Sequence, residues 1–112
     1  MNYKICVIGL GYVGLPLAIA FAEKFKVVGL DVDKNRINEL RSGFDRTLEV
    51  DKFILSSVKK SMTFSTDIQD TKSCNVYIVT VPTPVGKDNR PNLKLLIESS
   101  RAVGTVLNKN DI

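Results

Sequence analysis

Apolar runs separated by polar breaks divide this 112-residue chain into alternating strand and helix segments. Residues 3–8 (YKICVI) are almost continuously apolar, which is typical of a strand buried on both faces of a parallel sheet. Residues 12–24 are rich in Leu, Ala and Phe and long enough for a helix, and Pro16 falls in its first turn, where a missing N–H costs no hydrogen bond. A second strand is predicted over residues 26–31 (KVVGLD), so the chain opens with a β-α-β unit.

The same alternation continues through the middle of the chain. Asp33 is the residue type of an N-cap, and Gly43 has the character of a C-terminal stop, so a helix is predicted between them. Residues 49–60 predict a further helix, with apolar side chains close to one face at Val50, Phe53, Ile54 and Val58. A short strand, residues 62–65 (MTFS), is expected next.

The last third begins with residues 75–81 (NVYIVTV), the clearest buried strand of the second half. Residues 82–92 (PTPVGKDNRPN) are rich in turn formers and predict a loop at the carboxyl end of that strand. Residues 93–107 predict a helix of about four turns, with one stripe formed by Leu93, Leu96, Ile97, Ser100, Val103 and Leu107. Because residues 108–110 resemble a helix-to-strand turn, we expect residues 111–112 to begin another strand and the chain to be the N-terminal fragment of a longer protein.

This order of elements predicts an α/β fold: a Rossmann-like, doubly wound, mostly parallel sheet, truncated at its C-terminal end. Residues 1–112 form one domain, because no repeat, low-complexity segment or linker divides them. In such sheets ligands bind beyond the carboxyl ends of the strands, so the loops at those ends are where function is expected.

The first of these loops contains Gly9, Gly11 and Gly14 in the spacing G-x-G-x-x-G. That spacing alone is a weak signal, but here a strand precedes it, a helix follows it, and an acidic residue ends the next strand. In this context Gly9 permits the tight turn, Gly11 lets the backbone approach a pyrophosphate, and Gly14 lets the helix lie close to the strand. The helix N-terminus would then offer N–H groups and a positive dipole end to the phosphates.

Asp31, at the end of the second predicted strand, is placed to accept hydrogen bonds from the ribose hydroxyls of an adenosine. Its charge would repel a 2′-phosphate, which favours NAD over NADP, although Arg36 offers a partner for the extra phosphate. Thr83 follows the end of another strand, and its hydroxyl is a candidate cofactor contact. Purely structural interpretations remain open: the glycines as a turn, Asp31 as a solvated strand end, and Thr83 as a turn residue between prolines.

Composition narrows the possible chemistry. The chain has no histidine, and its two cysteines, Cys6 and Cys74, form no C-x-x-C pair, so neither a metal site nor a redox dithiol is predicted. The net charge of +4 is scattered along the sequence, which argues against nucleic-acid binding. No apolar run is long enough to cross a membrane and no signal peptide is recognisable, so we expect a cytoplasmic protein. No acid, base or nucleophile for catalysis is evident, and we predict no catalytic residue in the chain.

Two segments, KICVIGLGYVGLPLAIAFAEKFKVVGLDVDKNRINELRSGFDRTLEV and CNVYIVTVPTPVGKDNRPNL, together span nearly the whole chain. They resemble the N-terminal region of the UDP-glucose/GDP-mannose dehydrogenase family. The combination of GLGYVGLP with VPTP is more specific than the glycines alone. The segments GFDRTLEV and VTVPTP…PNL are most similar to the branch that oxidises UDP-N-acetylhexosamines for bacterial polysaccharides, including the Vi type and capsules.

The resemblance implies an NAD-dependent oxidoreductase that converts the 6-hydroxymethyl group of a UDP-sugar into a carboxylate with two NAD. It implies that Tyr12 and Val13 lie along the pyrophosphate, Asp31 and Arg36 at the adenosine ribose, and Thr83 near the cofactor. The family's nucleophilic cysteine lies beyond residue 112, so this chain is expected to bind NAD without turning over the sugar. The UDP-sugar, and a homodimeric state, are expected only of the full-length protein.

Two other functions are compatible with the glycine loop. A non-catalytic nucleotide-sensing Rossmann module would use the same motif, and the presence of a cysteine-bearing substrate domain elsewhere in the protein would distinguish the two. A methyltransferase is the weaker alternative, because a tight G-x-G-x-x-G turn followed by a Pro-containing helix suits a pyrophosphate better than S-adenosylmethionine.

Overall fold

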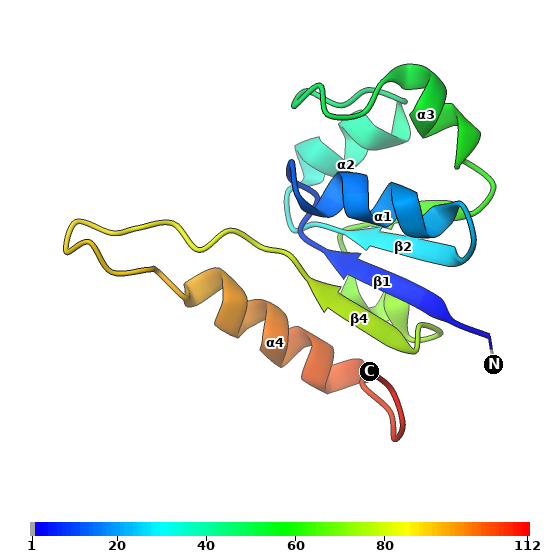
Figure 1. The fold of residues 1–112 in the computed structure, drawn as a ribbon. Coiled ribbons are helices and arrows are strands. Elements are labelled where there is room, and N and C mark those ends of the chain that lie inside the picture. Colours follow the sequence, from blue (N-terminus) through cyan, green and yellow to red (C-terminus); the bar gives the residue numbers. More distant parts are fainter. Residues whose placement is uncertain (1) are drawn as a thin grey trace.

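The computed structural model describes residues 2–112, which fold into a parallel four-stranded sheet in the order β3-β2-β1-β4, with helices on both faces (Figure 1). The strands are β1 (Lys4–Ile8), β2 (Lys26–Leu30), β3 (Met62–Ser65) and β4 (Val76–Val79). The helices are α1 (Gly14–Ala22), α2 (Lys34–Arg41), α3 (Lys52–Ser57) and α4 (Lys94–Val106), with a short 3₁₀ helix, η1 (Ile68–Thr71). The predicted doubly wound α/β fold is confirmed.

Strand β1 lies between two other strands and separates two hydrophobic cores. Ile5 and Val7 point into the core shared with α1, α2 and α3, whereas Cys6 and Ile8 point into the core on the side of η1 and α4. Successive strand side chains alternate between faces, so a strand covered on both sides must be apolar at nearly every position. This explains the continuous apolar run at residues 3–8.

The ends of α2 are fixed as the sequence predicted. The Asp33 side chain accepts hydrogen bonds from the N–H groups of Asn35 and Arg36, which have no partner inside the helix. At the other end Gly43 has φ +87°, and its N–H and that of Phe44 donate back to the last turn. This is the Schellman arrangement, in which glycine avoids the steric cost of a left-handed conformation.

The apolar face predicted for residues 49–60 is wrong at two positions. Val50 and Val58 are buried, but Phe53 is 86% exposed and Ile54 is 44% exposed, and Leu55 fills the core instead. The helix begins only at Lys52, after the N-cap Asp51. Because Leu55 faces the sheet, Phe53, two residues earlier, lies about 200° away around the helix and faces solvent.

Strand β4 is half-buried rather than fully buried, which corrects the prediction for residues 75–81. It forms one edge of the sheet, so it has a neighbouring strand, β1, on one side only. On the other side Ile112 donates its N–H to the Asn75 carbonyl and accepts from the Tyr77 N–H, at 2.9 and 2.7 Å. The strand also ends at Val79, two residues earlier than predicted.

Helix α4 forms where predicted, and Val103 of the predicted stripe packs against the core on that side of the sheet, but the larger apolar residues of the stripe stay partly exposed. Leu93, Leu96, Ile97 and Leu107 are between 36% and 46% exposed. Val106, which lies outside the predicted stripe, is the one buried residue of α4. Hydrophobic periodicity locates the helix but does not say which of its faces a neighbouring strand covers.

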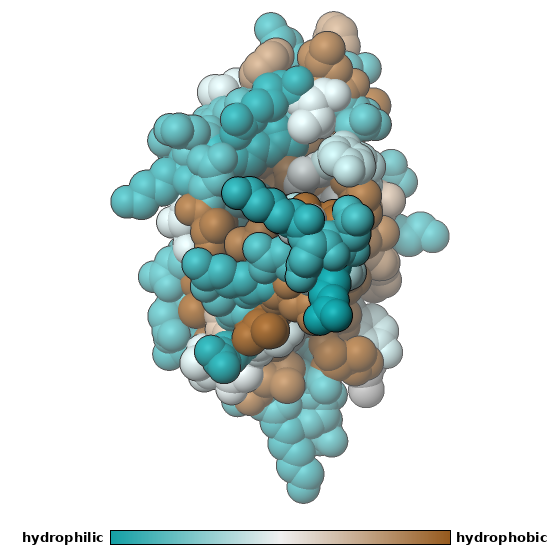
Figure 2. All heavy atoms as spheres, turned by 90° about the vertical axis from the view of Figure 1, so that its left-hand side faces the viewer, coloured by the Kyte–Doolittle hydropathy of each residue, from teal (hydrophilic) through white to brown (hydrophobic). Residues whose placement is uncertain are grey.

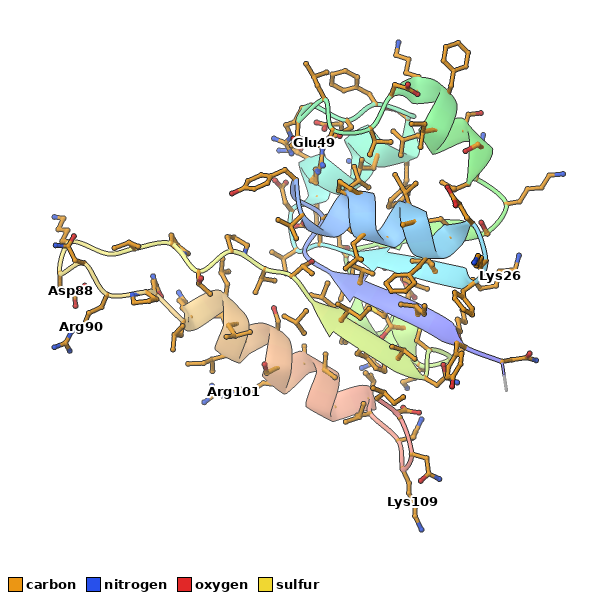
Figure 3. All side chains as sticks on the ribbon, in the orientation of Figure 1. Lys26, Glu49, Asp88, Arg90, Arg101 and Lys109 are labelled. Atoms are coloured by element: carbon orange, nitrogen blue, oxygen red, sulfur yellow. The ribbon has the colours of Figure 1, made fainter. Side chains whose placement is uncertain are left out.

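Residues 82–92 project away from the sheet beyond β4 (Figure 1). The segment is a hairpin-like turn, in which Val85 and Pro91 form an antiparallel bridge and the Gly86 N–H donates to the Arg90 carbonyl. The side chains of Asp88 and Arg90 extend outward from its tip (Figure 3). Seen from that side, the molecule presents mainly hydrophilic residues in front, with hydrophobic ones between and behind them (Figure 2).

None of the helices in residues 2–112 combines the length and the apolar character that a membrane span requires.

Candidate functional site

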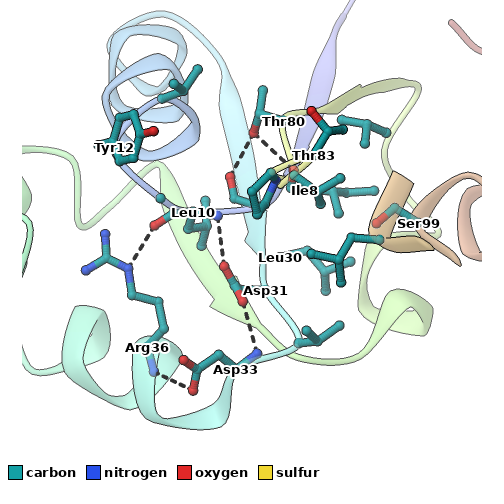
Figure 4. A pocket seen from close by; sticks show the side chains of 18 of the residues that line it. Ile8, Leu10, Tyr12, Leu30, Asp31, Asp33, Arg36, Thr80, Thr83 and Ser99 are labelled. Atoms are coloured by element: carbon teal, nitrogen blue, oxygen red, sulfur yellow. Dashed lines mark hydrogen bonds between the residues drawn. The ribbon is translucent and has the colours of Figure 1, made fainter. Parts of the chain in front are cut away.

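The carboxyl ends of three strands meet at one edge of the sheet. Ile8, the last residue of β1, is in register with Leu30 of β2 and Val79 of β4. The glycine loop and the segments that follow β2 and β4 therefore lie side by side and line a cleft of about 790 Å³, which residues of α4 and residues 46–47 complete (Figure 4). This is the position at which open α/β sheets bind ligands.

Gly9 and Gly14 are required by close packing behind the cleft. Gly9 has φ +94°, and a side chain there would press against the backbone of Thr80 and Val81. A Cβ on Gly14 would overlap the Gly9 carbonyl oxygen and Thr80 Oγ1. Thr80 Oγ1 donates toward the carbonyls of Ile8 and Gly9, at 3.0 and 2.8 Å, which ties the loop to the end of β4.

Gly11 differs from these two glycines because a Cβ built on it meets no heavy atom within 4 Å. The backbone is thus open toward the cleft. Within residues 2–112, the N–H groups of Gly11, Tyr12 and Val13 have no hydrogen-bond acceptor, and the N-cap Val13 supplies no side-chain cap. The N-terminus of α1 therefore presents unpaired donors, a geometry that suits a phosphate.

The Asp31 carboxylate sits between the glycine loop and the start of α2. Its Oδ2 accepts the Leu10 N–H at 2.9 Å, and its Oδ1 accepts the Asp33 N–H at 3.0 Å (Figure 4). Each carboxylate oxygen has a second lone pair, so the group retains acceptor capacity for ligand hydroxyls. The side chain lies in the cleft wall and is only half-buried.

Arg36 is 4% exposed and is held from several sides. Its Nε donates to the Leu10 carbonyl at 2.8 Å, and its Nη1 pairs with Glu39 at 2.7 Å and Asp45 at 2.8 Å. Its Nη2 is buried and has no hydrogen-bond partner within residues 2–112. A buried guanidinium nitrogen without a hydrogen-bond acceptor lowers the stability of the fold, unless a bound ligand supplies the acceptor.

Asp45 anchors the residues that fold over α2. Its carboxylate is buried and accepts hydrogen bonds from Thr47, from the Val50 N–H and from Arg36. Burial alone raises the pKa of Asp45, but the hydrogen bonds from Thr47, Arg36 and Val50 outweigh it and hold the pKa below its usual value. Asp45 therefore stays ionised opposite Arg36.

Of the eight residues that the sequence singled out, seven line the cleft: Gly9, Gly11, Tyr12, Val13, Asp31, Arg36 and Thr83. Gly14 lies behind the loop. Tyr12 and Val13 are exposed at the mouth, and Thr83 lies at the opposite side, on the segment after β4.

Sequence reasoning did not assign several polar residues to the cleft, among them Thr80, Arg46 and Thr47. The predicted strand over residues 75–81 contained Thr80, but β4 ends at Val79. A polar residue this near the carboxyl end of a strand could therefore have been recognised as a candidate for the cleft. Arg46 and Thr47 reach the cleft only because their segment folds over α2, and no local spacing indicates this.

Both cysteines are buried and free. Burial, and to a lesser degree the neighbouring Cys74, raise the pKa of Cys6 to about 12, and burial also raises the pKa of Cys74. Neither is in the thiolate form that a nucleophile requires. Within residues 2–112 no cluster of His, Cys, Asp and Glu side chains forms a candidate metal site.

Known proteins resemble this chain over nearly its whole length. UDP-N-acetyl-D-glucosamine 6-dehydrogenase of Pseudomonas aeruginosa is 50% identical over 111 residues, which are 99% of this chain and 26% of that protein. The enzyme of the same name from Salmonella typhi is 50% identical over 109 residues, which are 97% of this chain and 25% of that protein. The chain thus spans about a quarter of the length of these curated relatives.

A solved structure agrees with the sequence comparison. The UDP-D-ManNAc dehydrogenase of Pyrococcus horikoshii superposes with a TM-score of 0.90 at 34% identity, covering 97% of this chain and 27% of the other. The model of the UDP-glucose/GDP-mannose dehydrogenase family, NAD binding domain, matches residues 3–112. The cleft at the glycine loop and the match across these residues lead to one conclusion: the chain belongs to the UDP-glucose/GDP-mannose dehydrogenase family and forms its NAD-binding domain.

Proposed function

We propose that this chain holds the NAD of a nucleotide-sugar 6-dehydrogenase, which oxidises the C6 hydroxymethyl group of a UDP-N-acetylhexosamine to a carboxylate with two NAD, for bacterial polysaccharide synthesis. Support for the substrate comes from the two relatives that are 50% identical and are named UDP-N-acetyl-D-glucosamine 6-dehydrogenases. NAD supplies the hydride acceptor. The residues of this chain bind and orient it.

The observation that carries the proposal is the unpaired N-terminus of α1 above an open Gly11. Gly11, Tyr12 and Val13 would direct their N–H groups to the pyrophosphate, with the positive end of the helix dipole behind them. Gly9 and Gly14 would act indirectly, because they allow the loop and helix to approach Thr80 closely.

Asp31 and Arg36 would hold the adenosine ribose. The Asp31 carboxylate retains lone pairs for the two hydroxyls, and the buried Nη2 of Arg36 lacks a partner that a ribose oxygen would provide. Thr83, on the far wall of the cleft, would contact the part of the cofactor beyond the pyrophosphate.

The remaining expectations concern the full-length protein. We propose that residues 1–112 are its N-terminal domain, that its catalytic cysteine lies outside this chain, and that it acts as a homodimer in the cytoplasm. These expectations rest on the resemblance to the family. They predict that the chain alone binds NAD and leaves UDP-N-acetylhexosamine unoxidised.

Calorimetric titration of the chain with NAD, NADP and S-adenosylmethionine tests the proposal. We expect saturable binding of NAD, weaker binding of NADP and none of S-adenosylmethionine. Asp31→Ala should weaken NAD binding by at least about tenfold, the loss of two hydrogen bonds to a charged acceptor. Asp51→Ala, at the N-cap of α3 and outside the cleft, is the control. Failure of the wild-type chain to bind NAD would refute the proposed site, and a preference for NADP would refute the role of Asp31.

A further inference from the structure

The adenosine end of the cleft carries a second guanidinium, that of Arg46 in the GFDRTLEV segment, which was not among the predicted cofactor contacts. Arg46 lines the cleft together with Asp31, Asp33 and Arg36. Its Nε lies 3.1 Å from Glu39 Oε2, and its Nη2 lies 3.4 Å from Asp33 Oδ2. The Arg46 side chain is 49% exposed, so unlike Arg36 it faces solvent at the cleft.

Arg36 is poorly placed to receive a 2′-phosphate. Its Nε and Nη1 are occupied by Leu10, Glu39 and Asp45, and its side chain is only 5% exposed. A single remaining nitrogen, Nη2, cannot form the bidentate pair that makes arginine an effective phosphate ligand. Arg46 is the guanidinium at this end of the cleft that a phosphate on the ribose can reach from solvent.

Arg46 is nevertheless neutralised. Asp33 and Glu39 both contact its guanidinium, and the Arg46 N–H also donates to Glu39 Oε1 at 2.7 Å. Hydrogen bonds from the Arg36 and Asn35 N–H groups, together with Arg46, hold the pKa of Asp33 below its usual value, so its charge is present at neutral pH. Around the adenosine end, the carboxylates of Asp31, Asp33, Glu39 and Asp45 outnumber the two guanidiniums.

We propose that Asp33 is a specificity-determining residue that excludes NADP: it pairs with Arg46, and together with Asp31 it keeps this end of the cleft negative. Arg46 is then a latent ligand for a 2′-phosphate. The inference rests on the proposed binding of NAD in this cleft, and it assigns Asp33 a role beyond capping α2.

The two roles of Asp33 belong to different oxygens. Oδ1 accepts the N–H groups of Asn35 and Arg36 and caps the helix, whereas Oδ2 faces Arg46. Asparagine is as good an N-cap as aspartate, so Asp33→Asn keeps the cap and removes the charge. The variant therefore separates specificity from folding.

The test is calorimetric titration of the wild-type chain and Asp33→Asn with NAD and with NADP at one ionic strength. We expect Asp33→Asn to bind NADP about tenfold more tightly, because a like charge is removed beside the phosphate, with NAD affinity changed less than about twofold. Asp51→Asn is the matched control: it makes the same change at the N-cap of α3, away from the cleft, and should leave both affinities unchanged.

The double variant Asp33→Asn, Arg46→Gln identifies the phosphate ligand, and it should lose the gain in NADP affinity. If Asp33→Asn leaves the ratio of NADP to NAD affinity unchanged while NAD still binds, Asp33 is only a cap and the inference is overturned. Retention of the gain in the double variant overturns the role of Arg46. If the wild-type chain binds no NAD, the proposed function fails first, and the inference fails with it.

Discussion

Helices α1 and α4 flank the cleft from opposite faces of the sheet, but they are packed very differently. Five of the nine residues of α1 are buried, whereas Val106 alone is buried among the thirteen of α4. The core beneath α1 also receives α2 and α3, while α4 packs mainly against the edge strand β4 and η1. The wall of the cleft that carries the glycine loop is therefore fixed by a dense core, and the opposite wall is held by few contacts.

This difference predicts that substitutions near α1 cost stability and cofactor binding together, whereas comparable changes on α4 cost little of either. Truncating a buried side chain loses both transfer free energy and packing contacts, whereas truncating an exposed side chain loses little of either.

The largest effect is expected at Gly14. Gly14→Ala places a methyl group on the Gly9 carbonyl and Thr80 Oγ1, and we expect it to lower the free energy of unfolding by about 4 kcal/mol and to abolish NAD binding. Gly104→Ala in α4 is the matched change, because nothing lies within 4 Å of its Cβ. It should be neutral or stabilise by up to about 1 kcal/mol. Urea unfolding measures both, and similar losses in the two variants would contradict the difference between the walls.

A smaller effect is expected from removing apolar volume. Leu15→Ala empties a site that is 0% exposed and should cost about 3 kcal/mol. Ile97→Ala, at a position on α4 that is 46% exposed, should cost less than about 1 kcal/mol. Thermal unfolding of both variants checks this, and an equal cost would mean that the exposed stripe of α4 is covered in solution.

The smallest of the three effects concerns Asp45, the anchor of the loop over α2. Asp45→Asn leaves Arg36 with one fewer charge partner and should cost about 2 kcal/mol at pH 7. The pKa of Asp45 is lower in the folded than in the unfolded state. Its ionised form therefore stabilises the fold above the unfolded-state pKa of about 3.9, and this stabilisation is lost as the pH falls through the folded-state pKa.

The difference in the free energy of unfolding between wild type and Asp45→Asn should therefore become smaller below about pH 4. Urea unfolding at pH 7, 5, 4 and 3 measures it, with Asp51→Asn as an exposed-cap control that should stay within about 0.5 kcal/mol of wild type. A gap that is constant across this range would show that the charge of Asp45 does not carry its effect.

The same two regions explain what could be predicted from the sequence. Around α1, local rules decide the outcome: a strand covered on both faces is continuously apolar, Asp33 caps α2 and Gly43 ends it. The glycine positions and Asp31 followed from spacing, because their neighbours in space are near neighbours in the sequence or lie at the ends of adjacent strands.

Around α4 and the loop over α2, the outcome depended on distant partners. Periodicity identified the apolar stripe of α4 but not the face that β4 covers, and it misplaced Phe53 for the same reason. Arg46 reaches the cleft through pairs with Asp33 and Glu39, which lie on α2 or at its start. Such contacts depend on how a loop folds back, which no local pattern of residues encodes.

The backbone of Leu10 is held on both sides: its N–H donates to the Asp31 carboxylate, and its carbonyl accepts from Arg36 Nε. The loop proposed to contact the pyrophosphate is therefore pre-organised by the same two side chains proposed to contact the ribose. The entropy of ordering the loop is lost during folding rather than on binding, so more of the interaction energy with the dinucleotide remains as affinity. Mutation of either side chain would thus affect both halves of the proposed adenosine diphosphate site at once.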